Sequence, residues 1–258
     1  MTGRMQSPIP KAALITGGAR RIGRAIAEDL AAHGWSVAVH CCNAANDAGE
    51  AVDIIRAAGG TAVAVTADLA DADAALSLVA QAGAALGQPL TALVNNASLF
   101  EKDDITNLTA ESWDRHQAVN LRAPVLLTQT FAQALPAGVQ GNVVNMVDQR
   151  VLKLNPQYLS YTASKAGLWT LTRTLAQALA PHVRVNAVSP GPTLRNARQS
   201  DADFAAEQAR TLLGYGPELP EICAAVRFLL ETPSITGQMM ALDGGQHLKW
   251  RTDDILED

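Results

Sequence analysis

Residues 12–24 read AALITGGARRIGR, an apolar, β-prone run that passes directly into a glycine-rich turn and then into a helical pattern. Gly17 and Gly23 allow the backbone to pass close to a ligand. The amide groups of such a turn and the positive end of the following helix suit a pyrophosphate. A glycine-rich turn alone is weak evidence, but its place between a first strand and an amphipathic helix is the context that dinucleotide binding requires.

Outward from this stretch, short apolar runs alternate with longer alanine-rich segments of helical period. We expect strands at 12–16, 36–40, 61–66, 91–95, 142–147, 183–188 and 238–242, and helices at 22–33, 47–58, 71–86, 110–135, 157–180 and 217–230. Such alternation forms βαβ units, which give a parallel sheet with helices on both faces. The sequence therefore predicts a single doubly wound α/β domain over residues 1–258, with about seven strands.

The regular alternation breaks between Pro190 and Gly216, where prolines and glycines interrupt a polar stretch. A long loop in a compact domain is usually functional. We therefore expect residues 192–217 to form a substrate-binding lid with its own short helix, with a solvated surface excursion as the alternative. Residues 249–258 form an acidic tail.

Composition excludes several classes of function. The net charge is −5, and no stripe rich in Lys and Arg points to nucleic acid or an anionic membrane as partner. No apolar run approaches the roughly 20 residues that span a bilayer, so we expect a cytoplasmic protein with a small-molecule substrate. Three cysteines and five scattered histidines match neither a disulfide framework nor a metal site.

Tyr161 and Lys165 carry the clearest chemical signal. Residues four apart share one face of a helix, so a phenol and an ammonium are expected side by side. A neighbouring cation favours the phenolate, which would lower the pKa of Tyr161 towards the working range of an acid/base catalyst. Taken alone, the same spacing also occurs as an ordinary surface pair.

Several further motifs accompany this pair. In chain order they are Thr16-Gly17-x-x-x-Arg21-x-Gly23, Asp68, Asn95-Asn96-Ala97, Asn120, Tyr161-x-x-x-Lys165 and Pro190-Gly191. With these motifs the chain resembles the short-chain dehydrogenase/reductase family over about residues 11–247. The resemblance implies a Rossmann fold and an oxidoreductase that uses a nicotinamide dinucleotide.

The resemblance also implies which residues hold the cofactor. The motif glycines lie under it, the acid after the third strand and its neighbour hold the adenine, and the segment after the fourth strand lines the adenosine ribose. The cofactor residues expected on this basis are Gly17, Arg20, Arg21, Ile22, Gly23, His40, Asp68, Leu69, Asn96, Ala97, Ser98, Lys165, Pro190 and Gly191.

The end of the second strand indicates NADPH as the cofactor. An acid there would accept the ribose hydroxyls of NAD and repel a 2′-phosphate, but the chain reads His40-Cys41-Cys42-Asn43. Arg20 in the glycine turn is a possible partner for the phosphate. Relatives commonly place an arginine where Asn43 stands, so this part of their pattern is missing.

Two departures from the general family pattern indicate a narrower branch. Arg21 replaces the middle motif glycine, and Asp148 stands where the family usually carries a serine. Both resemble the pteridine reductases, as do Ser98 and Phe100. An aromatic face beside the nicotinamide can bind a flat pterin, while Arg21 and Ser98 bind its polar edge. Phe100 could also be an ordinary core residue.

Hydride transfer leaves an acceptor nitrogen or oxygen in need of a proton. We expect Tyr161 to supply it, and by resemblance we expect Lys165 to hold the nicotinamide ribose and Asn120 to anchor a proton-relay water. Asp148 would raise the pKa of the phenol through like-charge repulsion unless it is itself protonated or relays a proton. The resulting hypothesis is reduction of a dihydropterin to the tetrahydropterin.

Two other functions remain open at this stage. A generic reductase of this family would act on a ketone, an alcohol or a 3-oxoacyl thioester, and Asp148 speaks against it. A regulator that binds the cofactor without catalysis would have no use for Asn120, Tyr161 and Lys165. By resemblance, the helices that carry Asn120 and Tyr161 are expected to form the contacts of a homotetramer.

Overall fold

The computed structural model describes residues 11–196 and 198–250. Within these residues, seven strands form one sheet in the order β3-β2-β1-β4-β5-β6-β7, and all neighbouring strands are parallel. The strands are β1 (Ala12–Ile15), β2 (Ser36–Cys41), β3 (Thr61–Thr66), β4 (Ala92–Asn95), β5 (Gly141–Met146), β6 (Val183–Pro190) and β7 (Met239–Leu242). The predicted doubly wound α/β architecture is confirmed.

The strand order positions the functional segments. The chain builds outward from β1 to β3 and then returns to place β4 on the other side of β1. In such sheets, ligands bind outside the carboxyl ends of the strands, where the order reverses. The glycine turn follows β1, Ser98 follows β4 and Asp148 follows β5. All three segments therefore leave the same edge of the sheet.

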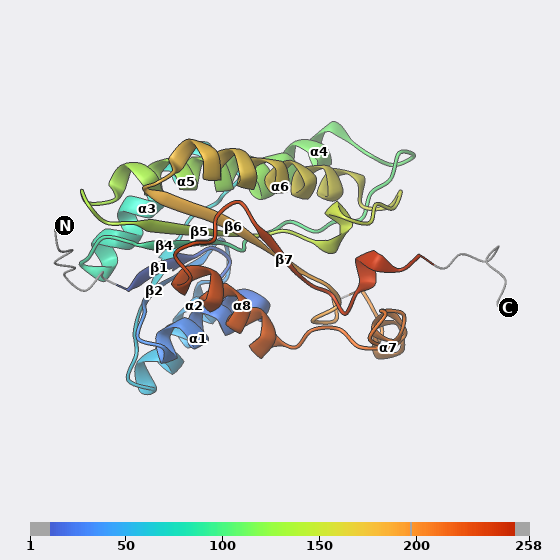
Figure 1. The fold of residues 1–258 in the computed structure, drawn as a ribbon, viewed down its shortest axis with the longest axis horizontal. Coiled ribbons are helices and arrows are strands. Elements are labelled where there is room, and N and C mark those ends of the chain that lie inside the picture. The colour runs from blue at the N-terminus through green and yellow to red at the C-terminus, as the bar shows by residue number, and fades with distance from the viewer. Residues whose placement is uncertain (1–10, 197, 251–258) are drawn as a thin grey trace, which may run out of the picture.

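Helices cover both faces of the sheet (Figure 1). One apolar core lies between the sheet and α1 (Arg21–Ala32), α2 (Ala45–Ala57) and α8 (Leu219–Glu231). A second core lies between the opposite face and α3 (Ala72–Leu86), α5 (Ala123–Ala134) and α6 (Leu159–Leu179). The strands are apolar on both sides because both faces are buried.

The single helix expected over residues 110–135 is interrupted. The structure has α4 (Ala110–Gln117), a π-helical turn (Ala118–Arg122) and then α5. Pro124 explains the break, because it has no N–H to donate to the carbonyl of Asn120, four residues earlier. Such π-turns are frequent at functional sites, and this one contains the predicted site residue Asn120.

The segment predicted as a lid contains one short helix, α7 (Asp201–Ala209), as expected. A capping box between Ser200 and Asp203 starts this helix, and none of its nine residues is buried. In Figure 1, α7 stands apart from the two helix layers. The segment is tied to the turn after β7, because the N–H of Leu213 donates to the carbonyl of Gly244. The acidic tail lies mostly outside the described residues.

Two 3₁₀ turns lie against each other at the same end of the molecule, Gln149–Val151 after β5 and Gln246–Leu248 after β7. The amine of Lys153 donates to the carbonyl of Lys249 at 2.9 Å. No helix in the described part of the chain has the length and apolar character needed to cross a membrane.

A substitution at Gly23 tests how tightly α1 packs against the glycine turn. A Cβ at this position would lie 2.2 Å from the carbonyl oxygen of Gly17 and 2.4 Å from Nδ2 of Asn96. We predict that Gly23→Ala lowers the free energy of unfolding by about 1–3 kcal/mol, as overpacking usually does. Urea unfolding followed by circular dichroism measures the change.

Gly49 provides the matched control, because it lies within α2 and a Cβ there would meet no atom within 4 Å. Gly49→Ala should raise the free energy of unfolding by about 0.5–1 kcal/mol through helix propensity. Equal stability of the Gly23→Ala variant and the wild type would contradict the described packing.

Candidate active site

The glycine turn after β1 is shaped for a close approach by a ligand. Gly17 has a φ of 61°, which glycine adopts without strain. A Cβ at Gly17 would lie 3.0 Å from the Cα of Ala97, so the turn and the segment after β4 touch. A side chain at Gly17 would crowd the segment that is expected to line the adenosine ribose.

Thr16 and Asn96 hold these two segments together. The hydroxyl of Thr16 accepts hydrogen bonds from the N–H groups of Asn96 and Ala97, at 2.9 and 3.0 Å. The side-chain amide of Asn96 donates to the carbonyls of Thr16 and Gly17, at 2.9 and 3.1 Å. Asn96 and Ala97 thus support the turn, and the bracing role of the Thr16 hydroxyl was not predicted from the sequence.

His40 lies beneath the turn rather than on its surface, with only 1% of its area exposed. Its Nδ1 accepts the N–H of Gly17 at 3.0 Å, so Nε2 carries the proton and donates to the carbonyl of Ala67 at 3.0 Å. Burial lowers the pKa of His40 and keeps the ring neutral. The expected part of His40 in cofactor binding is therefore indirect, through the position of Gly17.

The two arginines of the turn have partners within the protein. Arg20 forms an exposed ion pair with Asp47 at the start of α2. Arg21 has a φ of 54°, and its guanidinium donates to the carbonyls of Leu194 and Arg195, at 3.1 and 2.9 Å. The sequence predicted that Arg21 reaches a ligand, but here its fork binds the first part of the predicted lid.

The remaining predicted cofactor residues occupy different environments. Asp68 is exposed and its carboxylate accepts the N–H of Ala70 at 2.9 Å, whereas Leu69 is buried in the core. At the end of β6, a Cβ on Gly191 would lie 2.6 Å from the Cα of Asp243. Glycine at this position lets the strand end pass close to the turn after β7.

Asn120 fixes the segment after β4. Its side chain is fully buried, accepts the N–H of Leu99 at 2.7 Å and donates to the carbonyl of Leu99 at 2.9 Å. It also donates to the hydroxyl of Ser164 on α6, at 3.1 Å. The side chain therefore holds Ser98 and Phe100, the neighbours of Leu99, in position relative to α6.

Tyr161 and Asp148 are in direct contact. The phenol donates a hydrogen bond to Oδ2 of Asp148 at 2.9 Å. The amine of Lys165 lies 5.7 Å from the centre of the Tyr161 ring and donates to the carbonyl of Met146 at 2.7 Å. Tyr161 and Lys165 are both buried, at 6% and 2% exposure. The three predicted groups therefore lie together, with the carboxylate closest to the phenol.

Burial raises the pKa of Tyr161 well above its ordinary value, and the charge and hydrogen bond of Asp148 raise it further. Arg150 and the hydroxyl of Ser98 oppose this shift to a smaller extent. The prediction that Lys165 lowers the pKa of Tyr161 is wrong for this arrangement. The ammonium lies 5.7 Å from the centre of the phenol ring and donates its hydrogen bond to the carbonyl of Met146. The predicted effect of Asp148 is confirmed, and the phenol keeps its proton at neutral pH.

An aromatic cluster borders the phenol. Phe100 stacks on Tyr158 with ring centres 4.4 Å apart and meets Tyr161 edge-on at 4.7 Å. The guanidinium carbon of Arg150 lies 5.4 Å from the Phe100 ring and 5.1 Å from the Tyr158 ring. Tyr158 and Arg150 were not predicted, although their spacing from Tyr161 and Asp148, three and two residues, would have suggested proximity.

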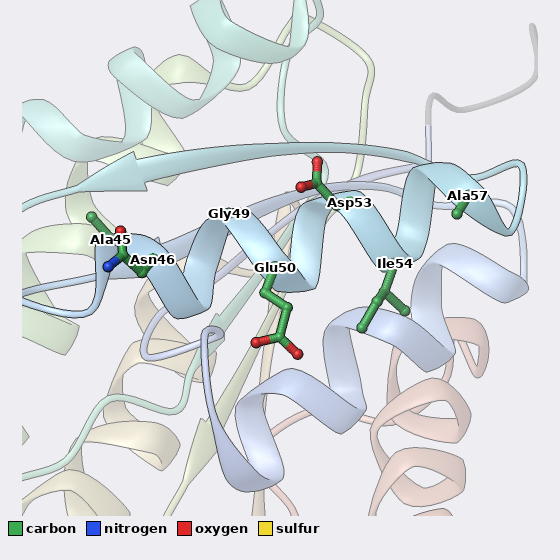
Figure 2. A pocket seen from close by; sticks show the side chains of 7 residues that line it. All are labelled: Ala45, Asn46, Gly49, Glu50, Asp53, Ile54 and Ala57. Carbon is green, nitrogen blue, oxygen red and sulfur yellow. The ribbon is translucent and has the colours of Figure 1, made fainter.

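A depression of about 620 Å³ lies elsewhere, along α2 between Ala45 and Ala57 (Figure 2). Its Glu50 side chain points towards α1, where it pairs with Arg24 at 3.0 Å. None of the predicted site residues lines it, so it is separate from the candidate active site. Across residues 11–196 and 198–250, no group of three or more His, Cys, Asp or Glu side chains is arranged to hold a metal ion.

Comparison with known proteins identifies the family. The model of the short chain dehydrogenase family matches residues 11–205. The chain belongs to this family. It is an oxidoreductase, and Tyr161 and Lys165 lie within the matched region.

Several members of the family are similar to this chain over nearly its whole length. The 3-oxoacyl-[acyl-carrier-protein] reductase of Staphylococcus aureus is 31% identical and covers 92% of this chain and 98% of its own length. Among solved structures, the FolM alternative dihydrofolate reductase 1 of Brucella canis, complexed with NADP, is 50% identical, with a TM-score of 0.93 and coverage of 97% and 100%. The corresponding protein of Brucella suis, also in complex with NADP, is 52% identical, with a TM-score of 0.92 and coverage of 95% and 98%.

The lowered pKa of the buried Lys165 predicts how the free energy of unfolding depends on pH. Burial lowers its pKa from 10.5 to about 8. Between these values the unfolded chain holds a proton that the folded protein has released, so stability rises as the pH rises from about 8 towards 10.5. Below about 8 both states hold the proton, and this contribution to stability no longer changes with pH. Urea unfolding at about pH 7.5 and 9.5 should show that the wild type gains on the order of 2 kcal/mol more than Lys165→Met over this interval.

Lys11→Met serves as the control, because Lys11 is exposed and pairs with Glu231 at the surface. This variant should follow the wild-type pH dependence. The same pH dependence in Lys165→Met and the wild type would show that Lys165 stays charged at its buried position.

Proposed function

We propose that the protein reduces a dihydropterin, of the dihydrobiopterin or dihydromonapterin type, to the tetrahydropterin with NADPH. The observation that carries this proposal is the hydrogen bond of Tyr161 to Asp148 beside the ring of Phe100. The similarity to two alternative dihydrofolate reductases, at 50% and 52% identity over nearly the whole chain, supports it.

The residues of the glycine cradle fit a dinucleotide. A Cβ at Gly23 would run into the carbonyl oxygen of Gly17, and one at Gly17 would crowd Ala97. Glycine at both positions therefore packs the turn closely against its neighbours, as the glycines of a dinucleotide-binding turn do. In this proposal Asp68 and Leu69 hold the adenine and Lys165 holds the nicotinamide ribose. NADPH bound there supplies the hydride. Arg20 would turn from Asp47 to the 2′-phosphate, and the neutral end of β2 would not repel it.

Tyr161 supplies the proton in this scheme. A phenol whose pKa is raised remains protonated at neutral pH, as a proton donor must. Asp148 holds the phenolic hydrogen by accepting its hydrogen bond, and it is placed to relay a replacement proton from water. The buried Asn120 sits in the π-turn and fixes the segment that carries Ser98.

The substrate side of the site suits a flat heterocycle. Tyr158 covers one face of Phe100 in parallel stacking, and we place the heterocycle against the other face. The hydroxyl of Ser98 is within hydrogen-bonding reach of the Tyr161 phenol, where it lowers the pKa of that phenol. From there it can also bind the polar edge of the heterocycle. The guanidinium of Arg21 donates to the backbone carbonyls of Leu194 and Arg195. When substrate binds, it can donate instead to a carbonyl of the heterocycle.

Reduction of a 3-oxoacyl thioester is the second candidate, because the reductase of Staphylococcus aureus shares 31% identity over 92% of the chain. Asp148 argues against it, since a carboxylate beside the phenol repels the alkoxide charge that develops on a carbonyl oxygen during hydride transfer. We further propose that residues 192–217 act as a lid, that the enzyme is cytoplasmic, and that it forms a homotetramer. On the face of α6 where Gly167 lies, the helix packs against Leu121 of the same chain, so this position is not free for a contact with another subunit.

A substrate panel tests the proposal. We expect the purified protein to oxidise NADPH with dihydrobiopterin or dihydromonapterin at a kcat/KM at least ten times that with a 3-oxoacyl thioester, and to use NADH poorly. Absorbance at 340 nm gives the rate. Turnover of the thioester alone would favour the second candidate, and equal kcat/KM with both dinucleotides would contradict the NADPH preference.

Asp148→Ser tests the role of the carboxylate in the same assay. The substitution removes the group that accepts the phenolic hydrogen, and we expect kcat for the dihydropterin to fall by about 10²-fold or more, as for a lost acid/base group. The dissociation constant of NADPH, measured by fluorescence, should stay within twofold. Asp53→Ser, at an exposed position of α2, is the control. An unchanged kcat in Asp148→Ser would exclude the relay.

A further inference from the structure

We propose that Arg150 is a positioning residue that holds Asp148 against Tyr161 and braces the Phe100–Tyr158 stack, and thereby sets the affinity for a flat substrate. This inference rests on the proposed function and extends it to a residue outside the family motifs.

The first observation is how the two oxygens of Asp148 are shared. Oδ2 accepts the phenol of Tyr161, and Oδ1 accepts the backbone N–H of Arg150 at 2.8 Å. Nη1 of the Arg150 guanidinium donates to both oxygens, at 3.3 Å to Oδ1 and 3.4 Å to Oδ2. Only 18% of the Arg150 side chain and 16% of the Asp148 side chain are exposed. The backbone N–H on Oδ1 and the guanidinium across both oxygens prevent the carboxylate from rotating away, and they keep Oδ2 directed at the phenol.

The second observation is the contact of Arg150 with both stacked rings. Its guanidinium carbon lies 5.1 Å from Tyr158 and 5.4 Å from Phe100, while the rings are 4.4 Å apart. Nearly equal distances place the cation beside the pair, in contact with both. A planar guanidinium can pair with a carboxylate and contact aromatic rings at the same time, which the compact ammonium of lysine does less well.

The third observation is that Tyr158 needs support. Its φ is 59°, a conformation that costs a bulky residue energy unless its surroundings enforce it. Its N–H donates to the carbonyl of Asp103 at 2.7 Å, and the buried carboxylate of Asp103 accepts the N–H of Ser160. These bonds fix the backbone at the start of α6, but the ring of Tyr158 is held by Phe100 and Arg150.

The charges around the phenol give Arg150 a second effect. The charged groups facing Tyr161 are Asp148 and Arg150 from the segment after β5 and Lys165 on α6 itself. On α4, His116 is bound to the N–H of Glu101 and the carbonyl of Ser112 instead. Arg150 partly offsets the repulsion by Asp148, which otherwise raises the pKa of Tyr161. Loss of Arg150 leaves the carboxylate without its cation, so the site should take up a proton at higher pH.

Arg150→Gln and Arg150→Lys test the proposal. For Arg150→Gln we expect the KM for the dihydropterin to rise at least tenfold, and the acid limb of the kcat/KM profile to move up by about one pH unit. The dissociation constant of NADPH should stay within twofold. Arg150→Lys keeps the positive charge but loses the planar guanidinium. The acid limb of its kcat/KM profile should therefore return towards that of the wild type, while its KM for the dihydropterin stays raised.

Arg227→Gln is the matched control. Arg227 pairs with Asp29 at 2.6 Å with similar burial, 25% and 21%, but joins α8 to α1 away from the site. Its loss should lower the thermal midpoint, because it removes a partly buried ion pair, without changing KM or the pH profile. A wild-type KM and acid limb in Arg150→Gln would overturn the role of Arg150.

The outcome separates this inference from the proposed function. If the wild type reduces a carbonyl compound but no dihydropterin, the proposed function fails. The shift of the acid limb is still expected with that compound, because it depends on Asp148 and Tyr161 alone, whereas the rise in KM requires a flat ring. Absence of the shift with any substrate that the wild type reduces contradicts the positioning role independently of the substrate class.

Discussion

The hydrogen bond from the phenol of Tyr161 to Oδ2 of Asp148 is the interaction on which the site depends. It joins α6 to the segment after β5 and makes the carboxylate, rather than the ammonium of Lys165, the nearest charge to the phenol. The result is a buried acid that keeps its proton at neutral pH. Such a group suits proton donation during reduction better than proton removal during oxidation.

The fold brings these groups together through one feature of its topology. Parallel strands end at the same edge of the sheet, so the glycine turn, the segment with Ser98 and the segment with Asp148 meet there. The surrounding polar side chains then fix the loops. Asn120 binds the backbone of Leu99, Asn96 binds the glycine turn, and Asp103 binds the start of α6. Each of these is buried or partly buried, and each bonds to backbone groups of a segment distant in sequence.

The sequence predicted the architecture and most of the site because both depend on local patterns. Alternating apolar and helical segments determine a parallel sheet, and the spacing of Tyr161 and Lys165 places them on one face of α6. The π-turn was missed although Pro124 signals it, since the helical pattern continues on both sides. The dominance of Asp148 over Lys165 and the turn of Arg21 towards the lid depend on side-chain directions between distant segments, which no spacing encodes. The two-residue spacing of Arg150 from Asp148 suggests their pairing, but the contact of Arg150 with Phe100 also joins segments distant in sequence.

The most direct test measures the protonation of Tyr161 itself. The chain has three tyrosines, at positions 158, 161 and 215, so protein labelled with ¹³C at tyrosine Cζ gives three NMR signals that Tyr→Phe variants assign. The account predicts that the Tyr161 signal stays in its protonated position beyond the ordinary pKa of about 10, and that Asp148→Asn moves its titration to lower pH. A Tyr161 signal that titrates below 10, or that is unchanged in Asp148→Asn, would contradict the account.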